Sequence, residues 1–594
     1  MAKVDQLQVK AGESQLLLSG RADDLTGNPR IDASLTGHMP LQDIAPLLPE
    51  DTELEAEGNA NIDLKAKFSW KDLAARNFEK MKVAGNLSVR EVDLDYEGLI
   101  ASFPEMNVAI AMPAQQHEGK LADVHISGAG DGNLLLEAGP ARLESQCDKF
   151  DITLAVNDII KNAIEADFSF TVGESEGAID ETTLSTGGIS LHGSIKHDDN
   201  QYGLLSQFSP QLGFSTNNTT FFTPGLPEAL KLTDLEVEYK DNALEILSAQ
   251  LMMGHTDLDI FGKFNNIEEW LDDEELLTGY LNLTSDYADI DQMMNLFSGA
   301  GSDPEELESM REEDGVPEDA TPFIVPKNID VTVNTHIKRS VAFDNDLRDL
   351  SGELRVKDGV AVLDQMGFVC KAARMQLTAM YKSPRPNNLF FSIDFHLLDI
   401  QIDELIDMIP CIDTLVPMLK AFNGNGDFHL AGETFLDARY QPKMSSLLGS
   451  AAFSGKDLIV FEDESLARTA KLIGLKSRKE DDNRIKIDSM DVEMTCFRKE
   501  IEVYPFLLNM GKYSFCISGV HNLAGLCNYH IELLKNPLLV KVGVDIKGSL
   551  SDPSISLGSV RYGDFYKPEK KGAATKKALE LKAMIRKELE RNVK

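Results

Sequence analysis

Hydrophobic and polar residues alternate along most of this chain. The clearest run places Leu389, Phe391, Ile393, Phe395 and Leu397 at every second position. Side chains two residues apart along a β-strand share one face, so this run predicts a strand with one apolar face. The stretch 80–265 consists largely of shorter runs of the same kind, separated by turn residues. This pattern is typical of an all-β architecture.

A second long run lies near the start of the chain. Ile62, Leu64 and Phe68 occupy alternate positions there, with Lys65 and Lys67 between them. The Asp358-Gly359 dipeptide between two apolar runs predicts a hairpin turn. The run at 447–461 is interrupted by Gly455-Lys456-Asp457, which predicts a second hairpin.

The apolar period changes from two to that of a helix at three places. Apolar residues recur there at i, i+3, i+4 and i+7, which predicts short amphipathic helices at 41–48, 290–297 and 402–409. Their starting positions are unevenly spaced, so a solenoid of fixed repeat length does not fit.

These patterns predict a mainly β protein. The expected fold is an elongated, curved antiparallel sheet or β-groove, with a few short amphipathic helices and a C-terminal helical tail. We expect an N-terminal β-rich repeat region at 1–300, an acidic linker at 301–322, a C-terminal β region at 323–562 and a basic helical tail at 563–594. The tail either contacts anionic headgroups or a partner, or is a solvated terminal helix.

Composition narrows the function classes. The formal net charge of the 594 residues is -39. This charge argues against a nucleic-acid-binding protein, which needs a basic footprint, and disfavours broad electrostatic binding to an anionic membrane. The six cysteines are too scattered for a disulfide scaffold. Cys516 could pair with Cys496 or Cys527, and free buried thiols are the other interpretation.

No motif for catalysis or cofactor binding stands in the required context. Gly128-x-Gly-x-Gly132 lacks the last glycine of a dinucleotide fingerprint, and the eleven histidines are dispersed without metal-ligand spacing. We therefore predict no catalytic, cofactor or metal residues. A carboxylate pair for sugar hydrolysis in a β-helical enzyme stays open as an alternative.

Several segments resemble the C-terminal region of AsmA-family proteins of the Gram-negative envelope. They are residues 326–335, 350–360 and 375–381, followed by 449–458 and 546–554. The resemblance covers roughly 320–562 well and the first 300 residues more loosely, and it extends to the larger TamB-type envelope proteins. It implies a long, curved antiparallel β structure with an apolar groove.

The resemblance also implies a function without catalysis. Such proteins support outer-membrane assembly and protein targeting to membranes, and larger relatives are linked to phospholipid movement between membranes. The expected partners are phospholipid acyl chains and the envelope membrane or its proteins. The family's N-terminal membrane anchor is absent from this sequence, which has no apolar run of about 20 residues. The expected location is periplasm-facing and inner-membrane associated if a targeting segment lies upstream, and cytoplasmic otherwise.

Two interpretations of the apolar faces follow. They line a lipid groove, or they pack as the dry core of a structural or protein-interaction scaffold that binds no lipid. The candidate groove-lining residues are Leu389, Phe391, Ile393, Phe395, Leu397, Ile62, Leu64 and Phe68.

Overall fold

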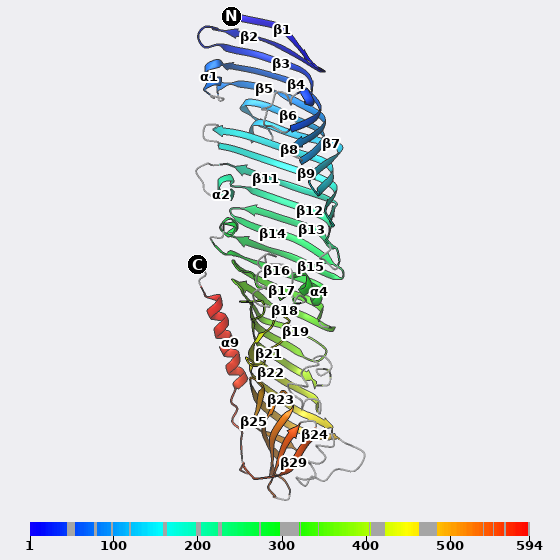
Figure 1. The fold of residues 1–594 in the computed structure, drawn as a ribbon, viewed down its shortest axis with the longest axis vertical. Helices are drawn as coiled ribbons and strands as arrows, with labels where there is room; N and C mark the ends of the chain where they lie inside the picture. Colours follow the sequence, from blue (N-terminus) through cyan, green and yellow to red (C-terminus); the bar gives the residue numbers. More distant parts are fainter. Residues whose placement is uncertain are drawn as a thin grey trace. The chain divides into compact units, whose positions relative to one another are not determined.

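The computed structural model confirms a mainly β protein with strands β1 to β29 (Figure 1). It describes residues 1–43, 54–75, 80–96, 99–117, 120–158, 163–197, 204–223, 228–272, 275–297, 320, 322–342, 344–402, 404, 422–461, 484–537, 540–549, 552–563 and 566–591. The chain divides into two units, Met1–Glu274 and Glu275–Lys594. Strand β16 (Leu277–Asp289) and helix α4 (Ile290–Phe297), which the sequence grouped with the N-terminal region, belong to the second unit.

Unit 1 is a ladder of antiparallel strands in sequence order, except that β10 and β11 lie end to end between β9 and β12, and each pairs with both of them. Short helices interrupt the order: η1 (Leu41–Asp43), α1 (Trp70–Ala74), α2 (Leu204–Phe208) and α3 (Ile267–Leu271). The strands are β1 (Ala2–Ala11), β2 (Ser14–Asp23), β3 (Arg30–Pro40), β4 (Leu54–Ser69), β5 (Lys82–Tyr96), β6 (Leu99–His117), β7 (Lys120–Ala138), β8 (Ala141–Asp158), β9 (Ala163–Ile179), β10 (Thr182–Thr186), β11 (Gly188–Lys196), β12 (Gln211–Phe222), β13 (Leu230–Lys240), β14 (Ala243–Met253) and β15 (Thr256–Asn265).

Unit 2 begins with β16 and α4 and ends with helix α9 (Ala573–Leu589). Its other strands are β17 (Ile329–Ala342), β18 (Asn345–Lys357), β19 (Val360–Val369), β20 (Arg374–Lys382), β21 (Leu389–Gln401), β22 (Phe422–Leu436), β23 (Leu448–Phe461), β24 (Arg484–Phe497), β25 (Glu500–Met510), β26 (Tyr513–Asn522), β27 (Leu526–Lys535), β28 (Val542–Ser549) and β29 (Asp552–Gly558).

One strand pair departs from the expected antiparallel order. Strands β16 and β17 pair in parallel, while β17 to β29 continue antiparallel. A parallel pair needs a crossover connection, and the segment between Asp289 and Ile329, which includes α4, supplies it. Alternation within a strand does not encode the direction of its neighbour, so the sequence pattern could not reveal this pair.

The two predicted hairpins have different outcomes. Asp358 and Gly359 both have positive φ and join β18 to β19, as expected for a two-residue hairpin turn. The hairpin predicted at 447–461 is wrong, because these residues form the single strand β23. Asp457, with φ +51°, is left out of the pairing with both neighbouring strands. The turn-like tripeptide is therefore a β-bulge.

The predicted short helices are described only in part. The helix at 290–297 is confirmed as α4, and η1 covers the start of the segment at 41–48. The remainder of that segment, most of the helix predicted at 402–409 and almost all of the acidic linker lie outside the described residues.

The main hydrophobic core lies in unit 2. It joins residues of β20–β22 to residues of β23–β28, among them Leu397, Phe453, Phe506 and Val544. Cys516 and Cys527 are buried free thiols, which confirms that interpretation of these two residues. Cys370 and Cys496 are also free, so neither candidate pairing of Cys516 forms. Burial, with a contribution from the charge of Glu532, raises the pKa of the Cys516 thiol to about 12.

Helix α9 confirms the predicted helical tail and packs on the sheet of its own unit (Figure 1). Leu581 is 1% exposed and contacts the cluster formed by Val360, Val362 and Met380. Ion pairs flank this contact: Lys577 Nζ lies 3.2 Å from Glu433 Oε1, and Lys382 Nζ lies 2.5 Å from Glu588 Oε1. One face of the basic tail is therefore bound to the sheet rather than solvated.

Leu581→Ala tests this packing. We expect it to weaken docking of α9 by about 3 kcal/mol, because a buried leucine is replaced without refilling its space. Hydrogen exchange of the α9 amides measures the effect. Leu579→Ala, at a position 61% exposed on the same helix, is the matched control and should leave exchange unchanged. Equal exchange in the two variants would contradict the packing.

Candidate functional site

A continuous line of apolar residues crosses unit 1 from β2 to β15. Cross-strand partners project from the same face of a sheet, so the strand register determines which residues meet. Each member of the line is the register partner of the next. We call this line the apolar row: Leu16, Gly37, Ile62, Leu87, Val108, Ile126, Ile152, Phe168, Gly193, Leu212, Tyr239, Leu244 and Phe264.

The apolar row is only half-buried along its whole length. A face covered by a second packed layer would hold mostly buried side chains. The buried cluster of unit 1 among the described residues is small, comprising Leu41, Ala60, Val89 and Val92. The residues of the apolar row are therefore not fully buried.

The opposite face of the same strands is mostly polar. On β4, Asp63, Lys65 and Lys67 are exposed, whereas Ile62 and Leu64 between them are half-buried. Leu64 belongs to a neighbouring line in which it pairs with Leu35 and Gly85 on the same face as the row. Phe68 also lies on this face and pairs with Ile31.

Three glycines on the apolar face lie very close to the neighbouring strand. A Cβ atom built on Gly85 would overlap the carbonyl oxygen of Asp63 and lie 2.7 Å from Leu64 Cα. A Cβ on Gly37 or Gly193 would overlap the neighbouring strand in the same way. A Cβ projects perpendicular to the sheet, so these overlaps mean that the adjacent strand is displaced toward the apolar face. Glycine kinks of this kind introduce sheet curvature.

The candidates on β21 in unit 2 divide into two groups. Phe391, Ile393 and Phe395 are half-buried, and they lie on the face opposite the one that α9 covers. Leu389 and Leu397 lie on the same face as these three residues but are fully buried. Leu397 belongs to the main core. Ile393 continues a line of register partners from the start of the unit: Leu281, Val333, Leu354, Leu363 and Ala379.

Residues 389–397 and 62–68 therefore lie in different units, each on the apolar face of its own sheet. Sequence reasoning found three residues of this face in unit 1 but missed most of the row. The missed residues include Phe168, Leu212 and Phe264. Each strand has the required alternation, but the register that aligns the strands is not visible in any single run.

Searches against protein-family models and curated proteins found no match to this chain. Within the part of the chain that the structure describes, no helix is long and apolar enough to cross a membrane.

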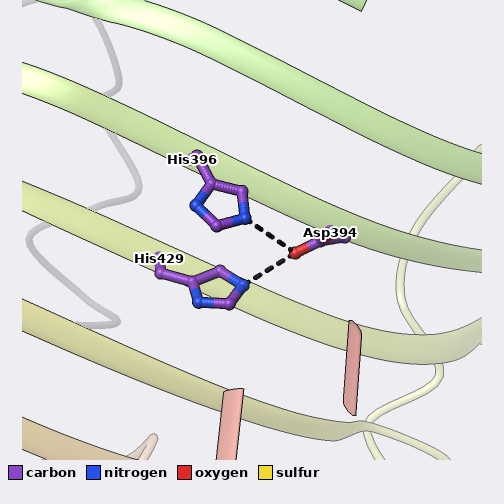
Figure 2. A group of neighbouring side chains, drawn as sticks. All are labelled: Asp394, His396 and His429. Carbon is purple, nitrogen blue, oxygen red and sulfur yellow. Dashed lines mark hydrogen bonds and ion pairs between the residues drawn. The ribbon is translucent and has the colours of Figure 1, made fainter. Parts of the chain in front are cut away.

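A polar cluster on β21 and β22 was also missed by the sequence patterns (Figure 2). Asp394 and His396 lie two residues apart on one face of β21, and His429 is the register partner of His396 on β22. His429 Nε2 donates a hydrogen bond to Asp394 Oδ1 at 2.7 Å, and His396 Nε2 lies 3.3 Å from the same oxygen. The two imidazole rings stack with centroids 3.8 Å apart.

The cluster perturbs the acidity of its members. Burial acts to raise the pKa of the Asp394 carboxyl, but the hydrogen bond from His429 and the charges of His396, His429 and Lys582 outweigh it. The pKa of Asp394 is therefore below its ordinary value. Burial and the charge of His429 lower the pKa of His396, against the opposing effect of Asp394.

Gly85→Ala tests the curvature of the apolar face. The added methyl group has no space beside Asp63, so we expect a loss of about 1–3 kcal/mol in the free energy of unfolding. Gly177→Ala on β9 is the control, because the nearest atom to its added methyl would be 3.4 Å away. Its stability should be unchanged or slightly higher. Denaturant midpoints that shift equally for both variants would show that the sheet is not kinked at Gly85.

Proposed function

We propose that this protein is a non-enzymatic lipid-handling protein of cell-envelope biogenesis. Its apolar face holds the acyl chains of phospholipids and supports their passage between membranes. The single observation that carries this proposal is the half-buried apolar row, which extends across thirteen neighbouring strands of unit 1.

The chemistry of the row suits a fluid hydrocarbon chain. Its side chains are apolar apart from the hydroxyl of Tyr239, so it offers little directional hydrogen bonding. A folded protein partner is usually recognised by anchors and a polar rim, whereas an acyl chain needs only continuous apolar contact. Each methylene group removed from water contributes about 0.8 kcal/mol. A row that shields the chains would therefore lower the cost of moving a lipid out of a bilayer.

The dimensions of the row also support the proposal. Thirteen strands at about 4.8 Å spacing give a row of roughly 60 Å. The hydrocarbon core of a bilayer is about 30 Å thick, so one acyl chain needs about 15 Å. The row is long enough for several chains placed end to end, as passage along it requires.

The resemblance of residues 320–562 to AsmA-family proteins supports an envelope role, including outer-membrane assembly and protein targeting to membranes. Phospholipid, the membrane and its proteins are the proposed partners. The scaffold alternative has one observation in its favour: the strands from β23 onward close on the main core of unit 2. We propose that this part is structural and that lipid contacts are made by the half-buried faces.

Photo-crosslinking at two adjacent positions of β4 tests lipid contact. A photoreactive amino acid at Leu64 would project from the apolar face, and the same group at Lys65 would project from the exposed polar face. The purified protein is incubated with vesicles of phosphatidylethanolamine and phosphatidylglycerol, irradiated and analysed by mass spectrometry. We expect phospholipid adducts at position 64 and a much lower yield at position 65.

Lys65 is the matched control because it shares the strand and the distance from both strand ends. Equal labelling at the two positions would indicate non-specific contact with the membrane, and absence of labelling at position 64 would reject acyl-chain binding by this face.

A further inference from the structure

We propose that Asp394, His396 and His429 form a binding site for a divalent transition-metal ion, with Zn²⁺ as the reference ion. This site is independent of the proposed lipid function, because it lies on the face of β21 opposite Phe391, Ile393 and Phe395. The ion would bridge ligands on the paired strands β21 and β22, on the face that α9 covers.

The geometry brings three ligand atoms to one point. One nitrogen from each histidine and one carboxylate oxygen lie within 4.8 Å of one another, and Figure 2 shows both rings directed toward Asp394. Zinc binds imidazole nitrogen at about 2.0–2.1 Å and carboxylate oxygen at about 2.0–2.2 Å, so two ligand atoms on a tetrahedral ion lie roughly 3.3–3.5 Å apart. The distance of 3.3 Å between His396 and Asp394 already matches this separation, whereas the 2.7 Å hydrogen bond between His429 and Asp394 must open slightly. The ion would take the place between the rings and the carboxylate, with the ring proton of each histidine on Nδ1.

The donor set determines the class of metal. Two imidazoles and one carboxylate suit Zn²⁺, Cu²⁺, Ni²⁺, Co²⁺ and Fe²⁺, whereas Ca²⁺ and Mg²⁺ prefer sites made only of oxygen. Three protein ligands leave room for water on the ion. The side chain of His396 is 36% exposed, so an ion can reach the site from solvent.

The fold fixes the ligands before any ion binds. All three residues lie on paired strands rather than on loops, and Asp394 has a side-chain exposure of only 7%. The stacked rings hold the two nitrogens on the same side of the sheet. Preorganised ligands bind more tightly, since less conformational freedom is lost on binding.

The positive charge of Lys582 on α9 acts on the cluster from outside. It lowers the pKa of both Asp394 and His396. A positive side chain near the site opposes the binding of a dication. Its removal should therefore strengthen metal binding, and this exposed side chain can be changed without altering a ligand or the core.

Calorimetric titration of the chelator-treated, dialysed full chain with Zn²⁺ tests the proposal. We expect one saturable site per chain in the wild-type protein. His396→Ala and His429→Ala should each weaken it by roughly tenfold or more, because a three-ligand site is reduced to two. His125→Ala is the matched control: His125 Nε2 and Asp151 Oδ2 lie 2.8 Å apart and belong to no three-ligand group among the described residues. This variant should bind Zn²⁺ like the wild type.

Titration of the Lys582→Gln variant with Zn²⁺ is a second test, and it does not depend on whether the ligand variants fold. We expect it to tighten Zn²⁺ binding several-fold at low ionic strength and less at high salt, because screening weakens the repulsion. The proposal is overturned if the wild type has no saturable site. It is also overturned if both ligand variants bind Zn²⁺ as well as His125→Ala does.

Discussion

Strand register is the constraint on which the rest of this structure depends. Side chains alternate between the two faces of a strand, so a slip of one residue between neighbours would move an apolar set to the polar face. In unit 1 the register holds over successive pairs, from Leu16 opposite Gly37 to Leu244 opposite Phe264. The same constraint in unit 2 places His429 opposite His396, two residues from Asp394. Both proposed sites are therefore consequences of how strands align.

The apolar faces of the two units differ in how far they are covered. In unit 2 the last strands close around residues such as Phe453 and Phe506, and α9 covers the outer face of β21 through Leu581. In unit 1 the apolar face curves at Gly37, Gly85 and Gly193 but stays half-buried. An apolar face that water reaches is unfavourable in isolation. Occupation by a hydrocarbon ligand would relieve that cost, which is the physical basis of the proposed function.

Much of the fold could be predicted from the sequence, because alternation is a local signal. It located the strands holding Leu64 and Phe391, the turn at Asp358-Gly359 and the helix at Ile290. Features that depend on distant residues could not be predicted. Gly455-Lys456-Asp457 has turn composition but forms a bulge, the partner of β16 is parallel, and His429 is far from Asp394 in sequence. The full burial of Leu389 and Leu397, in contrast to the half-buried Phe391, Ile393 and Phe395, could not be predicted either. Burial depends on strands elsewhere in the chain.

The most direct test of the central claim is mass spectrometry of lipid that copurifies with the protein. Phe168 lies in the apolar row, and the adjacent Ser169 lies on the exposed face of β9. A charged group in the row should expel acyl chains, since burying a carboxylate against hydrocarbon is costly. We predict phospholipid bound to the wild type and to Ser169→Asp, and a clear loss in Phe168→Asp. Wild-type protein without phospholipid, or equal amounts in both variants, would contradict the claim.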